Sequence, residues 1–158
     1  MNRITLTHPG KFMSLLLGKE DFDSYALVEA DLLMASHFHV DGELQKEFYS
    51  QDSDDEVPDY AYIPYGQIRP ILFALVKGKK LPLKCKLVLL APKEVTDLLC
   101  NCEDNTVPRE AVRGLSLTVL YQNGSVSLTT GLSLNTFLPD KSLENLWDQY
   151  IGNRFSDF

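Results

Sequence analysis

The chain has 158 residues, of which 44% are hydrophobic and 23% are charged. A chain of this length and composition fits one globular domain over residues 1–158, and it needs neither disulfides nor a structural metal to bury a core. No apolar run approaches the ~18 residues of a membrane-spanning helix. Met1–Thr7 lacks the apolar stretch of a signal peptide. We therefore expect neither a membrane-spanning helix nor a signal peptide.

The formal net charge of −7 is concentrated in one short segment. Residues 41–59 contain eight acidic side chains and a single lysine, so the remainder of the chain sums to zero. Within this segment, residues 50–59 show no apolar periodicity. This pattern predicts a mobile acidic loop attached to an electrically neutral body.

The chain has three cysteines, Cys85, Cys100 and Cys102. Their number is odd and their spacing does not suggest a disulfide framework, so we expect reduced thiols. Reduced thiols are typical of a reducing compartment, and we therefore expect a cytoplasmic protein.

The first predicted elements are a short strand over Ile4–Leu6 and a helix that ends near Gly18. Thr7 is a suitable N-cap for this helix, and Pro9 suits its first turn because the missing N–H has no helical partner there. Three apolar residues at helical spacing form the face expected to enter the core.

From residue 25 to residue 41 apolar and polar side chains alternate, which predicts one long, half-buried strand with a bend in its middle. A turn at Asp41-Gly42 is then expected to start a partner strand. In that hairpin His39 would lie opposite Glu43, and the apolar and polar faces of the two strands would match.

The middle of the chain predicts a helix at about 67–77, a strand at 81–91 and a helix that begins at Pro92. The clearest local signal follows them. Asn123-Gly124 separates two alternating segments, and an Asn-Gly pair is the strongest short-range hairpin signal because both turn residues need positive φ.

A last helix is expected after Asp140, with Trp147 on its apolar face. Together these elements predict an α+β fold: a mixed or largely antiparallel sheet with two β-hairpins, covered by about four helices.

The sequence also resembles a small, uncharacterised bacterial family. The blocks that carry the resemblance are Leu27-Val28-Glu29-Ala30, Val40-Asp41-Gly42-Glu43-Leu44, Lys77-Gly78-Lys79-Lys80-Leu81-Pro82-Leu83, Thr129-Thr130-Gly131, Asp140-Lys141-Ser142-Leu143-Glu144 and Trp147-Asp148. This family of Gram-positive anaerobes is defined only as a domain of unknown function. The resemblance implies a bacterial, single-domain, cytoplasmic protein, and it brings no activity, substrate or catalytic residue.

The first candidate site is a possible divalent metal centre at His37, His39, Asp41 and Glu43. Alternation places both histidines on one face of a strand, and imidazoles with carboxylates suit zinc, iron or manganese. Such a ligand set would leave positions open for a water nucleophile. The alternative is that these residues simply form the solvent-exposed face of an amphipathic strand. No cofactor motif is evident elsewhere.

The second candidate site is basic. Five lysines within ten residues, with no acidic residue among them, are the candidate nucleic-acid contacts: Lys77, Lys79, Lys80, Lys84 and Lys86. The alternative is that the first lysines complement the C-terminus of a helix and the last two protect a strand edge.

No local catalytic motif is present: neither a nucleophile elbow nor a glycine-rich phosphate loop occurs. The leading interpretation is therefore a non-enzymatic cytoplasmic binding or regulatory module with an unknown protein or small-molecule partner. The alternatives are a nucleic-acid-associated protein that uses the lysines and a metal-dependent enzyme that uses the His-x-His face.

Overall fold

The computed structural model describes residues 2–51, 54 and 56–158. The strands are β1 (Arg3–Thr5), β2 (Ala26–Leu33), β3 (His37–Asp41), β4 (Lys84–Leu90), β5 (Val112–Gln122) and β6 (Ser125–Leu134). The helices are α1 (Pro9–Gly18), α2 (Lys46–Tyr49), α3 (Tyr65–Val76), α4 (Lys93–Cys100) and α5 (Ser142–Arg154), with one 3-10 turn, η1 (Arg109–Ala111).

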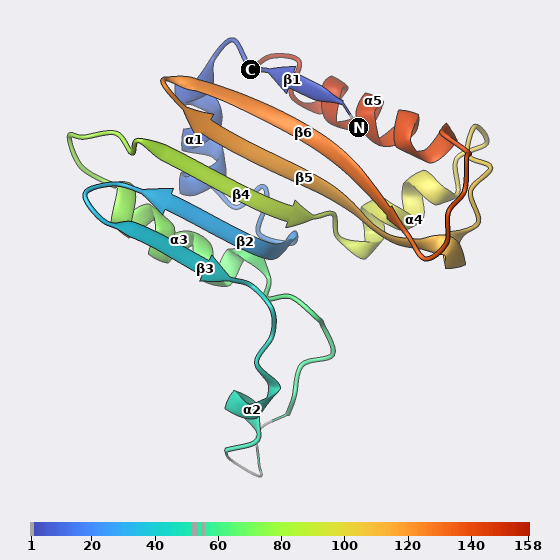
Figure 1. Cartoon of the computed structure of the whole chain (residues 1–158), viewed down its shortest axis with the longest axis horizontal. Coiled ribbons are helices and arrows are strands. Elements are labelled where there is room, and N and C mark those ends of the chain that lie inside the picture. The colour runs from blue at the N-terminus through green and yellow to red at the C-terminus, as the bar shows by residue number, and fades with distance from the viewer. Residues whose placement is uncertain (1, 52–53, 55) are drawn as a thin grey trace.

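All six strands belong to one antiparallel sheet with the order β1-β6-β5-β4-β2-β3 (Figure 1). The predicted α+β class is therefore confirmed. Every neighbouring pair of strands is antiparallel, and short turns join the β2–β3 and β5–β6 pairs.

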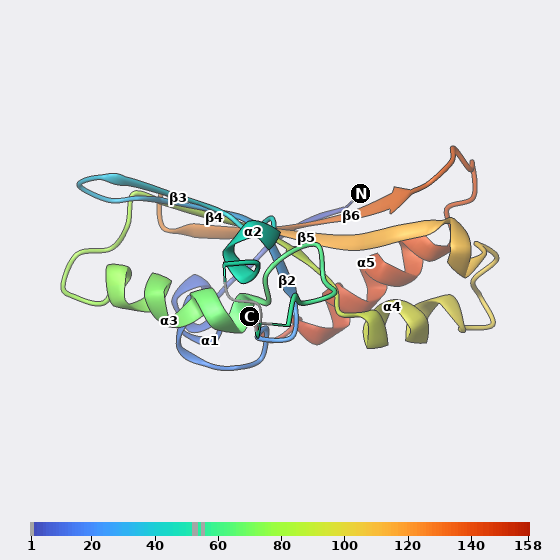
Figure 2. The same ribbon diagram turned by 90° about the horizontal axis from the view of Figure 1, so that it is seen from below.

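The helices α1, α3, α4 and α5 all lie against one face of the sheet, as Figure 2 shows. The core lies between these two layers, where alternate residues of β4 and β5 are buried against the helices. Trp147 of α5 is completely buried, and its indole N–H donates to the Ser116 carbonyl at 2.8 Å. The predicted core role of Trp147 is confirmed.

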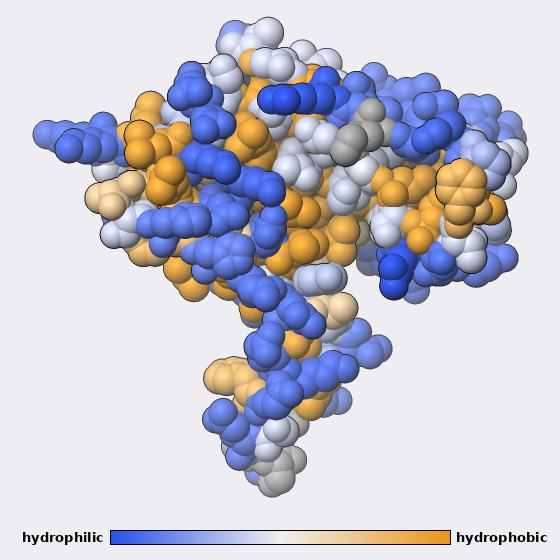
Figure 3. Space-filling view, viewed as in Figure 1, coloured by the Kyte–Doolittle hydropathy of each residue, from blue (hydrophilic) through white to orange (hydrophobic). Residues whose placement is uncertain are grey.

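The other face of the sheet, called the open face from here on, carries no helix in the described part of the chain (Figure 2). It presents the alternate residues of the same strands. Figure 3 shows this face, with hydrophilic side chains in rows and apolar side chains between them.

The hairpin predicted at Asn123-Gly124 is confirmed. Asn123 has φ 53° and Gly124 has φ 75°, as the tight turn requires. Tyr121 pairs with Val126 and Val119 pairs with Leu128, so apolar residues face each other across β5 and β6. This hairpin lies inside the sheet, with β1 beside β6 and β4 beside β5.

The hairpin predicted with its turn at Asp41-Gly42 is wrong. Residues 25–41 form two strands rather than one, because the chain turns after Leu33 and β3 pairs back onto β2 with Leu33 opposite His37. The loop between them has three residues, so the partners share the same parity and the alternating pattern continues unbroken through the turn. An unbroken pattern of this kind cannot be distinguished in sequence from a single long strand.

Gly42 does not turn a hairpin, and its conformation is not left-handed. The Gly42 backbone lies very close to the backbone of β2. A Cβ at this position would lie 1.7 Å from the carbonyl oxygen of Leu27. The Gly42 N–H donates a hydrogen bond to the Val28 carbonyl oxygen at 2.9 Å, beside the bulge in β2. The glycine is therefore required by a close approach of two backbones.

After Gly42 the chain leaves the sheet in an arm that carries α2 and projects from the body (Figure 1). The two legs of this arm pair at its base, where Glu43 bridges to Tyr62 and the Leu44 N–H donates to Ala61 at 2.9 Å. The predicted mobile loop at 50–59 falls partly on residues 52, 53 and 55, which lie outside the described residues.

Candidate functional site

An apolar groove lies between α1 and the C-terminal end of α3 and has a volume of about 510 Å³. The lining residues of α1 run along its whole length, from Pro9 to Gly18. Phe73, Leu81 and Tyr121 contribute large apolar side chains from the other elements. Ligand sites of proteins are typically apolar hollows of this size with a few polar groups at the edge.

Small side chains on α1 leave the space for this groove. Gly10, Ser14 and Gly18 follow one another at four-residue spacing, which places them on one face of the helix. No atom lies within 4 Å of the position that a Cβ would take at Gly10 or Gly18. The α1 side of the groove is therefore formed largely by backbone and short side chains.

The two helices that form the groove are held in place by buried polar contacts. The Tyr65 hydroxyl donates to the Leu16 carbonyl at 2.9 Å, and burial raises the pKa of this phenol. The Arg69 guanidinium binds both oxygens of Asp23, at 2.7 and 3.2 Å. Asp23 lies in the turn after α1, so the Tyr65 hydrogen bond joins α3 to α1 and the Arg69 pair joins α3 to that turn.

One end of the groove is basic. Lys77 and Gly78 line it, and Lys79 and Lys80 follow in the exposed loop that leads to Leu81. In the described part of the chain, none of these three lysines takes part in an ion pair. Leu81 is 78% exposed, so apolar surface continues from the groove to the outside of the molecule beside these charges.

The other two predicted lysines lie elsewhere. Lys84 and Lys86 belong to β4 and point to the open face, while Lys77, Lys79 and Lys80 follow α3. The Lys86 ammonium lies 3.2 Å from a carboxylate oxygen of Glu29. Lys86 is therefore partly neutralised, and the five lysines divide into a loop group and a sheet group.

The second candidate site is a polar cluster on the open face, at the edge formed by β2 and β3. Both predicted histidines contact Asp31: His37 Nε2 and His39 Nδ1 each lie 2.9 Å from its Oδ1 atom. The hydrogen bond from His39 lowers the pKa of Asp31, and Asp31 in turn raises the pKa of His39. Glu29 lies on the same face, two residues earlier in β2.

The structure brings together only part of the predicted metal-ligand set. Asp41 lies opposite Glu29, on the same face as the histidines, and its Oδ1 accepts the Glu43 N–H at 2.9 Å. Glu43 lies beyond the end of β3, and Asp31 rather than Glu43 is opposite His39. Glu29 and Asp31 have odd numbers like the two histidines, so alternation puts all four on one face. Only the turn after Leu33 brings the two acids close to the histidines.

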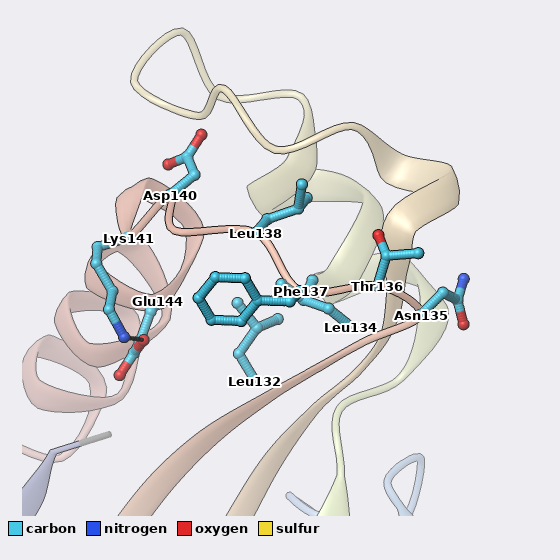
Figure 4. Close-up of a pocket in the computed structure, with 9 residues that line it drawn as sticks. All are labelled: Leu132, Leu134, Asn135, Thr136, Phe137, Leu138, Asp140, Lys141 and Glu144. Atoms are coloured by element: carbon cyan, nitrogen blue, oxygen red, sulfur yellow. Dashed lines mark hydrogen bonds and ion pairs between the residues drawn. The ribbon is translucent and has the colours of Figure 1, made fainter.

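A second hollow, of about 360 Å³, lies where the chain passes from β6 to α5. Figure 4 shows the Phe137 ring in its middle, with Asn135 and Thr136 directed away. Asp140 belongs to the helix start: the Thr106 hydroxyl and the Ser142 N–H donate to its carboxylate and lower its pKa. The last helix begins after Asp140, as predicted, and the Asp140 carboxylate accepts the N–H of its first residue, Ser142. The carboxylate therefore has a structural role at the start of α5.

Two of the three cysteines lack the character of a reactive thiol. All three are free thiols, and burial raises the pKa of Cys85 to about 12. Burial also raises the pKa of Cys100. A reactive cysteine requires a lowered pKa, whereas the pKa values of Cys85 and Cys100 are raised, which favours the unreactive protonated thiol.

Fold and site together define an α+β domain of two layers, with an apolar groove among its helices and a polar cluster on its open face. A model of a family of unknown function (DUF5721) matches residues 15–157, so the chain belongs to that family. The predicted membership of an uncharacterised family is thereby confirmed. No curated protein and no solved structure shows significant similarity to the chain. Among the described residues, no helix combines the length and apolar character needed to cross a bilayer.

Proposed function

We propose that this protein is a binding module that holds an acidic, amphipathic helix of a partner protein in the groove between α1 and α3. The observation that carries the proposal is the groove itself: an apolar hollow of about 510 Å³ that follows α1 and ends at lysines. Amphipathic helices bind many proteins by placing their apolar face in such a groove.

The shape of the groove supports a helical ligand. The ten residues of α1 correspond to a length of about 15 Å, which is nearly three helical turns. Gly10, Ser14 and Gly18 expose the α1 backbone along this length, so a second helix can approach closely. The apolar surface also continues onto Leu81, which extends the contact beyond the hollow.

The charge around the groove supports an acidic ligand. Lys77, Lys79 and Lys80 lie at one end and are not ion-paired within the described residues. Complementary charge accelerates association and selects the orientation of a partner. A helix with an apolar stripe and carboxylates at one end would match both properties of the groove.

A displayed library of random peptides of about 16 residues tests this proposal, because bound helices of this type need three to four turns. The untagged full chain is the bait. Peptides that also bind a Phe73→Glu, Leu81→Glu double variant are removed. We expect the remaining sequences to share an apolar stripe at helical spacing and an excess of Asp and Glu.

The recovered peptides are then measured by fluorescence polarisation. We expect the double variant and a Lys77→Glu, Lys79→Glu, Lys80→Glu variant each to weaken binding by about tenfold or more, which corresponds to ~1.4 kcal/mol. Leu98→Glu is the control, because the exposure of Leu98 lies between those of Phe73 and Leu81, but Leu98 belongs to α4, away from the groove. It should leave binding unchanged.

Three outcomes would overturn the proposal. Enrichment of no peptide, or of peptides without acidic residues, would exclude an acidic helix. Displacement of a peptide by a fatty acid at equal concentration would assign the groove to an acyl chain. Salt-dependent binding of a single-stranded oligonucleotide that requires the three loop lysines but not Phe73 would favour the nucleic-acid alternative.

We further infer a cytoplasmic location, supported by the free thiols Cys85, Cys100 and Cys102. A bacterial origin in Gram-positive anaerobes is likewise supported only by the resemblance of the sequence blocks. Fractionation of cells that express the chain without a tag tests the location. Recovery outside the cytoplasm would contradict it.

A further inference from the structure

Four ionisable side chains converge on the open face, away from the groove. Asp31 lies at their centre, within 2.9 Å of one ring nitrogen from each of His37 and His39. Asp31 is 22% exposed, whereas the two histidine side chains are 59% and 50% exposed. The cluster is thus open to solvent and accessible to an ion.

The backbone places these groups rigidly. Glu29 and Asp31 alternate on β2, and the register of the hairpin places His39 directly opposite Asp31. β2 is held on its other side by β4, so both ligand-bearing strands are part of the hydrogen-bonded sheet. Sites built on strands keep their geometry better than sites built on loops.

The spacing of the side-chain atoms is close to that of a metal centre. One potential ligand atom from each of Glu29, Asp31 and His39 lies within 4.8 Å of the others. Ligands at about 2.0–2.2 Å from a tetrahedral ion are roughly 3.4 Å apart. Small rotations of these accessible side chains would close the difference.

We propose that Glu29, Asp31 and His39, with His37 as a fourth ligand, bind a first-row divalent transition metal such as zinc. Two carboxylates balance the charge of the ion, and two imidazoles favour zinc over calcium or magnesium, which prefer oxygen ligands alone. The site lies on the opposite side of the sheet from the groove and does not depend on the proposed peptide binding.

Lys86 provides a specific signature of this site. Its ammonium group lies 3.2 Å from a carboxylate oxygen of Glu29, and the metal would bind that same carboxylate. A cation that enters the cluster must displace the ammonium group and remain near its charge. Lys86→Met should therefore strengthen metal binding, while loss of a true ligand weakens it.

The test is calorimetric titration of Zn²⁺ into the untagged full chain, together with the absorption spectrum after Co²⁺ addition. We expect one ion per chain and a spectrum without thiolate charge transfer. Asp31→Asn and His39→Ala should each weaken binding by about tenfold or more. Lys86→Met should bind more tightly than the wild-type chain.

Three variants control for other sites. His8→Ala removes the remaining histidine, which lies at the start of α1. Glu43→Gln removes a carboxylate that the structure places outside the cluster. Cys100→Ser, Cys102→Ser removes the accessible thiols. All three should leave the affinity unchanged, and circular dichroism should show that every variant is folded.

The absence of binding to the folded wild-type chain would overturn the proposal. So would an affinity that Asp31→Asn and His39→Ala do not change, because the ion would then lie elsewhere. Loss of binding in the double cysteine variant would assign the ion to the thiols. Weaker rather than stronger binding in Lys86→Met would contradict the placement of the ion beside the Lys86 ammonium group.

Discussion

The β5–β6 hairpin lies inside the sheet, with a neighbouring strand on each side, whereas the β2–β3 hairpin ends it at one edge. β5 buries every second side chain under the helices, but no residue of β3 is fully buried. Both strands of the first hairpin therefore contribute to the core, whereas the second contributes through β2 alone and carries Asp31, His37 and His39 on its open face. An edge strand that the core does not need is free to carry polar chemistry.

The largest expected effect is in the central hairpin. Leu117 of β5 is completely buried between strands and helices. Leu117→Ala should lower the free energy of unfolding by about 2–5 kcal/mol, since it removes buried methyl groups and leaves a cavity. Urea denaturation followed by circular dichroism measures this value. A loss below ~1 kcal/mol would mean that the centre of the sheet is not the main source of stability.

The second expected effect is in the edge region, where Gly42 passes over β2. A Cβ at residue 42 would lie 1.7 Å from the Leu27 carbonyl oxygen, and a backbone atom cannot rotate away. Gly42→Ala should cost about 1–3 kcal/mol, as overpacking does. The same denaturation experiment checks it, with Gly18→Ala as a control whose Cβ meets open space. Equal stability of the two variants would contradict this close approach.

The third effect tests the turn of the central hairpin. Gly124 has φ 75°, and no atom lies near the position of a Cβ there, so only backbone strain opposes substitution. Gly124→Ala should cost about 1 kcal/mol. Asn123→Gly should stay within ~0.5 kcal/mol of the wild type, because glycine adopts positive φ readily. Thermal unfolding compares the two, and a larger loss for Asn123→Gly would reverse the expectation.

The smallest effect is expected for the polar cluster. His39 is half exposed, and its contact with Asp31 is accessible to water. His39→Ala should change the free energy of unfolding by less than ~1 kcal/mol, as for exposed ion pairs in general. Chemical denaturation without added metal provides the measurement. A loss comparable to that of Leu117→Ala would show that β3 is structural, and the contrast between the two hairpins would disappear.

Much of the fold follows from local chemistry. Asn123-Gly124 requires positive φ at both positions, and the tight turn then places apolar partners opposite each other across β5 and β6. The helices α4 and α5 follow from their apolar spacing and from proline or aspartate before their first residue. The apolar spacing also predicts α3, but this helix begins at Tyr65, before the predicted start, and Pro70 lies inside it. Each of these features depends on residues that are close in sequence.

The candidate site was only partly predictable. Alternation places His37 and His39 on one face, and the structure does so. The residue opposite His39 was predicted as Glu43 but is Asp31, because a three-residue turn after Leu33 leaves the alternating pattern unchanged. The groove had no sequence signal, because it arises where α1, α3 and the β5–β6 turn meet.

The sequence by itself determined the α+β class, the central hairpin and the concentration of acidic charge in residues 41–59. These properties depend on composition, on periodicity and on the φ angles that particular residues tolerate. Only the tertiary structure decided where β3 pairs, what Gly42 approaches and which side chains surround Asp31. The reason is physical: pairing between strands and packing between helices depend on contacts between distant residues, and alternation along one strand does not specify its partner.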